Sequence, residues 1–136
     1  AGDQLFGPTV LDDVAFGPLN QGLNRDKAYQ IALQQLERLN IVGLKDRSVN
    51  TLSGGEQNFT ALAGVLAMQP KVLLLDEPTN GLDVKNIAKL TALLRELQLP
   101  MLIASHDLRF SETLADSCLS LATDNDGQMC SSYLRK

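Results

Sequence analysis

Apolar residues recur at helical spacing in three stretches of the chain, and these stretches predict its long helices. The expected helices run from about residue 25 to 39, from 54 to 69 and from 84 to 97. Each follows a residue that can cap a helix, in order Asn24, Ser53 and Asp83.

Two apolar runs of strand length, 71–76 and 101–105, each follow a proline. The helical stretch between them predicts a parallel pair joined by a right-handed crossover, and therefore an α/β fold. A short helix near 108–114 and a hairpin of 117–122 with 128–133 should follow. Residues 1–23 contain two Gly-Pro pairs and are expected to be an irregular surface segment.

The first apolar run ends in two adjacent carboxylates, Asp76 and Glu77. An unbroken apolar run is typical of a strand buried on both faces, and open α/β sheets bind ligands at the carboxyl ends of such strands. Adjacent side chains on an extended backbone point to opposite faces, so one acid could hold a cation while the other orients or deprotonates a water. The alternative is a core strand that ends in a solvated acidic turn.

A second pattern, Leu52-Ser-Gly-Gly-Glu56, starts the second helix. Ser53 and Glu56 fit a capping box, and Gly54 and Gly55 let backbone N–H groups approach an anion closely. An ordinary well-capped helix is the alternative. His106, the single histidine, follows the second strand, beside the strand that carries the acids. A lone histidine is more often structural than functional. His106, however, follows the carboxyl end of a predicted parallel strand, which is where open α/β sheets bind ligands.

These residues resemble the nucleotide-binding subunits of ATP-binding cassette (ABC) transporters. Leu52–Glu56 is similar to the signature loop LSGGQ, with Glu56 in place of glutamine. The resemblance extends to the Walker B strand (Val72–Asp76), the catalytic glutamate (Glu77), the D-loop (Asn80–Asp83) and the switch histidine (His106). Residues 3–18 resemble the segment after the Q-loop in cobalt, nickel and energy-coupling-factor importers.

The resemblance implies the C-terminal part of a P-loop NTPase-type ABC ATPase, with a parallel sheet flanked by helices and a helical subdomain. Residues 1–70 would form the helical signature subdomain with its transporter-facing segment, and 71–136 the Walker B, D-loop and H-loop part of the core. No G-x-x-x-x-G-K-[ST] occurs in the sequence, so the Walker A half is expected to be missing. The intact protein would be an ATP hydrolase, and this fragment alone would be inactive.

The resemblance also assigns roles, with ATP and Mg²⁺ as cofactors. Glu77 would be the general base, His106 would contact the γ-phosphate, and Asp76 would hold Mg²⁺. The residues expected at ATP of a facing subunit are Ser53, Gly54, Gly55, Glu56 and Asp83. The expected partners are a second ATPase subunit, in a homo- or heterodimer, and transmembrane subunits at the cytoplasmic face of a prokaryotic cell membrane.

Composition narrows the choice of partners. The net charge is −4 and no lysine or arginine precedes Arg25, which argues against nucleic acid. No apolar stretch reaches the roughly 20 residues of a spanning helix, so membrane association is expected through other chains.

Two alternative functions stay open, an inactive ABC-like remnant that serves as an interaction module and a soluble ABC ATPase outside transport. The second would carry a coiled-coil insertion or a basic patch, and this chain has neither.

Overall fold

The computed structural model describes residues 7–114 together with the backbone of 119–122 and 128–131. The chain divides into two compact units, the first ending at Pro70 and the second beginning at Lys71. The boundary lies between a helix and a strand.

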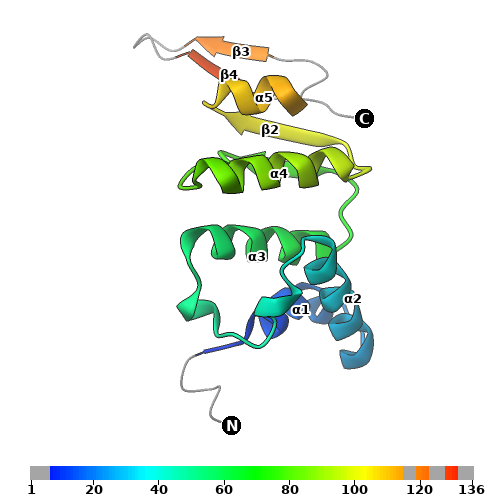
Figure 1. Ribbon diagram of the computed structural model, residues 1–136. Coiled ribbons are helices and arrows are strands. Elements are labelled where there is room, and N and C mark those ends of the chain that lie inside the picture. The colour runs from blue at the N-terminus through cyan, green and yellow to red at the C-terminus, as the bar shows by residue number, and fades with distance from the viewer. Residues whose placement is uncertain (1–6, 115–118, 123–127, 132–136) are drawn as a thin grey trace. The chain divides into compact units, whose positions relative to one another are not determined.

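The first unit is helical (Figure 1). Its helices are α1 (Val10–Asn20), α2 (Arg25–Arg38) and α3 (Gly54–Ala67), with the short 3₁₀ turns η2 (Val42–Leu44) and η3 (Val49–Thr51) between α2 and α3. The three helices pack against one another. Their buried apolar residues include Val10, Val14, Ala28, Ala32, Leu36, Phe59, Leu62, Ala63 and Leu66. The predictions for α2 and α3, including the caps at Asn24 and Ser53, are confirmed.

The expectation of an irregular segment over residues 1–23 is wrong for α1. Thr9 caps this helix in a capping box with Asp12, whose carboxylate also accepts a 2.6 Å hydrogen bond from the Tyr29 hydroxyl of α2. Pro18 lies in the last turn of α1, where it has no N–H to donate and the helix forgoes one hydrogen bond of its ladder. Its ring is buried with Val14, and this packing outweighs the local signal for a break.

The second unit contains β1 (Leu73–Asp76), α4 (Val84–Glu96), β2 (Met101–Ser105), α5 (Leu108–Leu114), β3 (Leu119–Ala122) and β4 (Gln128–Ser131). The strand order is β1-β2-β4-β3. β1 and β2 are parallel, with Leu73 opposite Met101, and β4 is antiparallel to both β2 and β3. The predicted parallel pair is therefore confirmed, and so is the hairpin over residues 119–122 and 128–131. Its predicted residues 117–118 and 132–133 lie outside the described residues.

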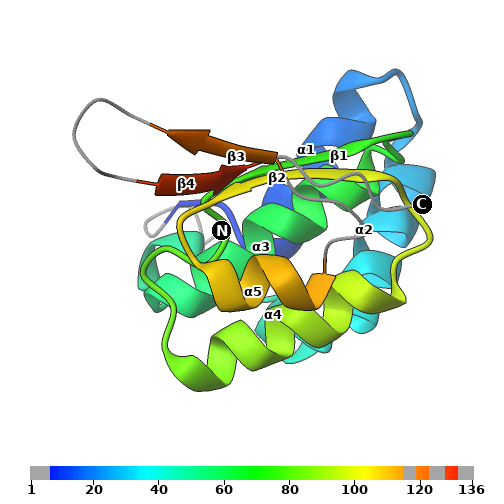
Figure 2. The ribbon, with the colours of Figure 1, turned by 90° about the horizontal axis from the view of Figure 1, so that it is seen from above.

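Helices α4 and α5 lie side by side on one side of the β1–β2 pair (Figure 2). Leu73, Met101 and Ile103 are buried on that face. Leu74, which points to the opposite face, is 69% exposed, and Val72 and Leu102 are exposed with it. The prediction that β1 is buried on both faces is thus wrong, because the helices of this unit cover one face of the pair. Val84, which begins α4, is also exposed although it fits the helix's apolar spacing.

Candidate functional site at the carboxyl ends of β1 and β2

Asp76 ends β1, and the chain turns sharply at the next residue. Glu77 has φ 48°, a left-handed conformation that costs a non-glycine residue about 1 kcal/mol. Its N–H donates a 2.7 Å hydrogen bond to the Ala104 carbonyl of β2, which holds the turn against the neighbouring strand. The two acids therefore do not alternate along an extended backbone, as the sequence suggested. The strand ends at Asp76, and Glu77 begins the turn.

This turn brings the Glu77 carboxylate to His106, the residue after β2. The His106 imidazole Nδ1 contacts Glu77 Oε1, and the backbone N–H of His106 donates a hydrogen bond to Glu77 Oε2 at 3.3 Å. The Glu77 side chain is 28% exposed and that of His106 is 63% exposed. A half-buried carboxylate held on two sides and an accessible imidazole thus share one end of the parallel pair. Sequence analysis placed both residues at this edge but did not anticipate their direct contact.

Asp76 is exposed at the same edge, where Ala104 is its partner in the register of β1 and β2. Within residues 7–114, no three histidine, cysteine, aspartate or glutamate side chains gather into a cluster that could hold a metal ion. Asp76 therefore offers a single carboxylate, and the remaining ligands of a cation would have to be water or substrate oxygens. Mg²⁺ is commonly held in that way, by one or two carboxylates together with waters and phosphates.

The turn between Glu77 and α4 has its own hydrogen bonds. Asn80 N–H donates to the Glu77 carbonyl at 3.1 Å, and Gly81 has φ 79°, which favours glycine. Asp83 caps α4 by accepting a 2.7 Å hydrogen bond from the Asn86 N–H. The cap predicted at Asp83 is confirmed.

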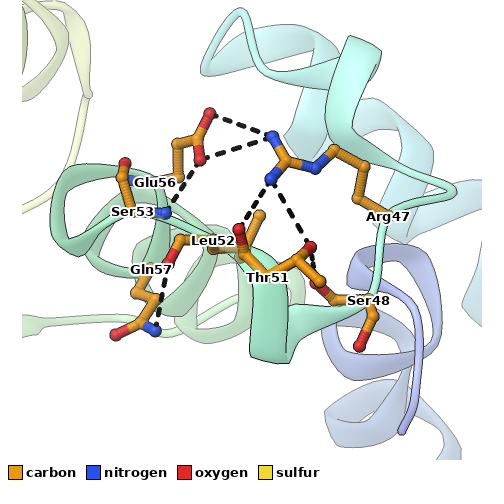
Figure 3. Close-up of polar contacts among 7 residues, drawn as sticks. All are labelled: Arg47, Ser48, Thr51, Leu52, Ser53, Glu56 and Gln57. Atoms are coloured by element: carbon orange, nitrogen blue, oxygen red, sulfur yellow. Dashed lines mark hydrogen bonds and ion pairs between the residues drawn. The ribbon is translucent and has the colours of Figure 1, made fainter. Parts of the chain in front are cut away.

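The signature loop, Leu52–Glu56, lies in the first unit (Figure 3). Ser53 Oγ accepts from the Glu56 N–H at 3.2 Å, and Glu56 Oε1 accepts from the Ser53 N–H at 2.9 Å, so the predicted capping box is present. A Cβ on Gly54 would meet no heavy atom within 4 Å. Packing in the described chain therefore does not demand glycine there, whereas close approach of a ligand to the backbone would.

Arg47, which precedes the signature loop and contacts it, was not predicted from the sequence. Its Nη2 donates to the Thr51 carbonyl at 2.7 Å, and its Nη1 lies 3.4 Å from Glu56 Oε2. The hydrogen bond from the Ser53 N–H, followed by the charge of Arg47, lowers the pKa of Glu56 below its ordinary value. The nine-residue separation of Arg47 and Glu56 matches no helix or strand period, so no sequence signal connects them.

The site residues fall into two groups. Asp76, Glu77, Asp83 and His106 belong to the second unit, and the signature loop belongs to the first.

A family model described as ABC transporter matches residues 5–80, more than half of the chain. The chain belongs to the ABC transporter ATP-binding protein family.

Relatives agree with this assignment. An ABC transporter ATP-binding protein of Haemophilus influenzae is 74% identical over 121 residues, which are 89% of this chain and 56% of that protein. The energy-coupling factor transporter ATP-binding protein EcfA of Methanothermobacter thermautotrophicus is 40% identical, covering 93% of this chain and 41% of the relative. The cobalt import ATP-binding protein CbiO of Rhodobacter capsulatus is 44% identical, and the match covers 85% of this chain and 42% of that protein. The chain spans about half the length of the curated relatives it matches.

Solved structures show the same fold. The cbiO1 protein of Clostridium perfringens, part of the ABC transporter complex cbiONQ, aligns with a TM-score of 0.68 and 41% identity, covering 79% of this chain and 44% of that one. A bacterial ABC transporter cassette solved as a dimer aligns with a TM-score of 0.67 and 28% identity, covering 81% of this chain and 53% of that one. The fold is that of part of an ABC ATPase cassette, and every helix that the structure describes is too short or too polar to span a bilayer.

Proposed function

We propose that this chain forms part of an ATP-hydrolysing subunit that powers an ABC importer for metal ions or vitamins. The observation that carries the proposal is the contact of Glu77 with His106 at the carboxyl ends of two adjacent parallel strands, beside Asp76. An acid, a histidine and a second acid at this edge suit phosphoryl transfer, in which positioning and electrostatics supply most of the catalysis.

The acidic edge fits Mg²⁺ because Asp76 presents an exposed carboxylate there. When bound with ATP, Mg²⁺ neutralises charge on the phosphates. In our proposal Asp76 holds the ion, and Glu77 accepts a proton from the attacking water. His106 orients the Glu77 carboxylate and reaches the γ-phosphate with its exposed ring. The left-handed turn at Glu77 supports this division because the Glu77 carboxylate contacts His106, whereas Asp76 is the last residue of β1.

The signature loop fits a phosphate through Gly54 and Gly55. The N-terminus of α3 carries free helical N–H groups and a positive dipole end, and Gly54 leaves space for close approach. We propose that Ser53, Gly54 and Gly55 bind the γ-phosphate held by a facing ATPase subunit, with Glu56 at the rim and Asp83 working across the same interface. The dimer of a similar cassette supports a facing subunit.

The importer class is supported by the relatives EcfA and CbiO. We propose transmembrane subunits as further partners, with this subunit bound at the cytoplasmic face of the membrane. Segments 9–20 and 45–51 are the proposed contacts. They lie together in the first unit, where the Val10 N–H donates to the Arg47 carbonyl at 2.9 Å.

The proposal is tested on an intact subunit, meaning one that contains this chain together with a P-loop. Hydrolysis of ATP should depend on Mg²⁺, and Asp76→Asn should raise the Mg²⁺ concentration needed for half-maximal rate by about tenfold or more. Asp107→Asn, which changes an acid near the same edge, is the matched control. An intact subunit whose hydrolysis needs no divalent cation would overturn the proposal.

A further inference from the structure

Glu56 creates an electrostatic conflict at the signature loop. Its carboxylate is one of the first side chains of α3, next to the N–H groups of Gly54 and Gly55 that we propose for a phosphate. A free carboxylate there would repel the phosphate and compete for the same donors. The structure shows where that carboxylate is directed instead.

Both oxygens of Glu56 are engaged away from the glycines. Oε1 accepts from the Ser53 N–H at 2.9 Å, and Oε2 lies 3.4 Å from Arg47 Nη1 (Figure 3). The guanidinium is itself fixed by the 2.7 Å hydrogen bond from its Nη2 to the Thr51 carbonyl. Arg47 therefore spans from η3 to α3 and supplies one positive charge to one acid.

We infer that Arg47 is a positioning residue that holds Glu56 in the capping box and cancels its charge, so that the N–H groups of Gly54 and Gly55 can receive a phosphate. This inference rests on the proposed function of these two glycines. The side chains of Arg47 and Glu56 are 44% and 33% exposed, and exposed ion pairs contribute little to global stability. The role of Arg47 is then local, in where one carboxylate points.

The first test uses the chain itself and needs no nucleotide. Hydrogen exchange of the Ser53 amide, measured by NMR, reports whether Glu56 still accepts a hydrogen bond from the Ser53 N–H. Arg47→Gln should speed this exchange by about threefold or more, whereas Arg47→Lys should keep part of the protection. Arg38→Gln, which removes an exposed arginine from α2, is the matched control. Unchanged Ser53 exchange in Arg47→Gln would overturn the inference.

The second test measures ATP-dependent dimerisation of the intact subunit in a double-mutant cycle. Arg47→Gln should weaken dimerisation by roughly tenfold in the wild-type background and by much less with Glu56→Gln, which keeps the cap without its charge. Equal losses in both backgrounds would show that Arg47 acts on the phosphate or the fold directly, and would overturn the inference. If the wild-type subunit does not dimerise with ATP, the proposed function fails, while Ser53 exchange still decides whether Arg47 positions Glu56.

Discussion

The imidazole of His106 contacts the carboxylate of Glu77, although 29 residues separate them in the chain. The contact exists because β1 and β2 are parallel neighbours whose carboxyl ends meet at one edge. If His106 orients Glu77 in hydrolysis, His106→Ala should lower kcat of the intact subunit by about tenfold or more, with little change in ATP affinity. Leu108→Ala, at an exposed position two residues on, is the control. A His106→Ala subunit with normal kcat would remove the histidine from the mechanism.

The chain by itself should not bind ATP tightly. Its sequence holds no P-loop, so the triphosphate would lack the backbone cradle and lysine that such a loop supplies. Isothermal titration of the 136-residue chain with Mg-ATP should show no micromolar binding and no hydrolysis. Micromolar affinity would reveal a phosphate site elsewhere in the chain.

The signature loop should act on the nucleotide of a facing subunit. Ser53→Arg places bulk and a misplaced charge where that subunit approaches, so ATP-dependent dimerisation of the intact subunit should be lost. Its own ATP affinity should change little if, as we propose, the loop binds only the nucleotide of the facing subunit. Ser53→Thr, which can keep the cap, is the control. Loss of ATP affinity with normal dimerisation would leave Ser53 as a helix cap only.

The bond between Tyr29 and Asp12 should make the stability of the first unit depend on pH. The Tyr29 hydroxyl is the main cause that lowers the pKa of Asp12, and the same bond raises the pKa of Tyr29. A carboxylate with a lowered pKa stabilises the fold above its unfolded pKa, and this contribution is lost as the pH falls through the folded value.

Tyr29→Phe should therefore lower the free energy of unfolding by about 1 kcal/mol at neutral pH. The difference from wild type should shrink as the pH falls through the lowered pKa of Asp12. Urea denaturation across the acid range measures this, with Asp13→Asn as a control in the same turn. A difference that stays constant down to the lowest pH would contradict the charged hydrogen bond.

Sequence patterns predicted the elements whose signals are local. Helical spacing with a capping residue was enough for α2, α3 and α4, and the paired apolar runs were enough for β1 and β2. The Gly17-Pro18 turn signal does not predict α1, whose formation rests on the Thr9–Asp12 capping box and on the burial of Val14. Packing between helices decided that case, and a single-sequence pattern does not contain it.

For the candidate site, the residue types and their edge of the sheet were predictable, but the contacts were not. The left-handed turn at Glu77 follows from its hydrogen bond to Ala104, which depends on the register of two strands. The contact of Arg47 with Glu56 depends on how η3 leads into α3. Both are tertiary relationships without a sequence period.

The most direct test of Glu77 as the general base is turnover of the intact subunit carrying Glu77→Gln, measured together with ATP binding. The amide keeps the shape of the side chain but cannot accept the proton of the attacking water. If Glu77 is the base, hydrolysis falls by about 100-fold or more while ATP binding is retained and a nucleotide-bound dimer accumulates. Near-normal hydrolysis by Glu77→Gln would contradict it and show that the base is another group.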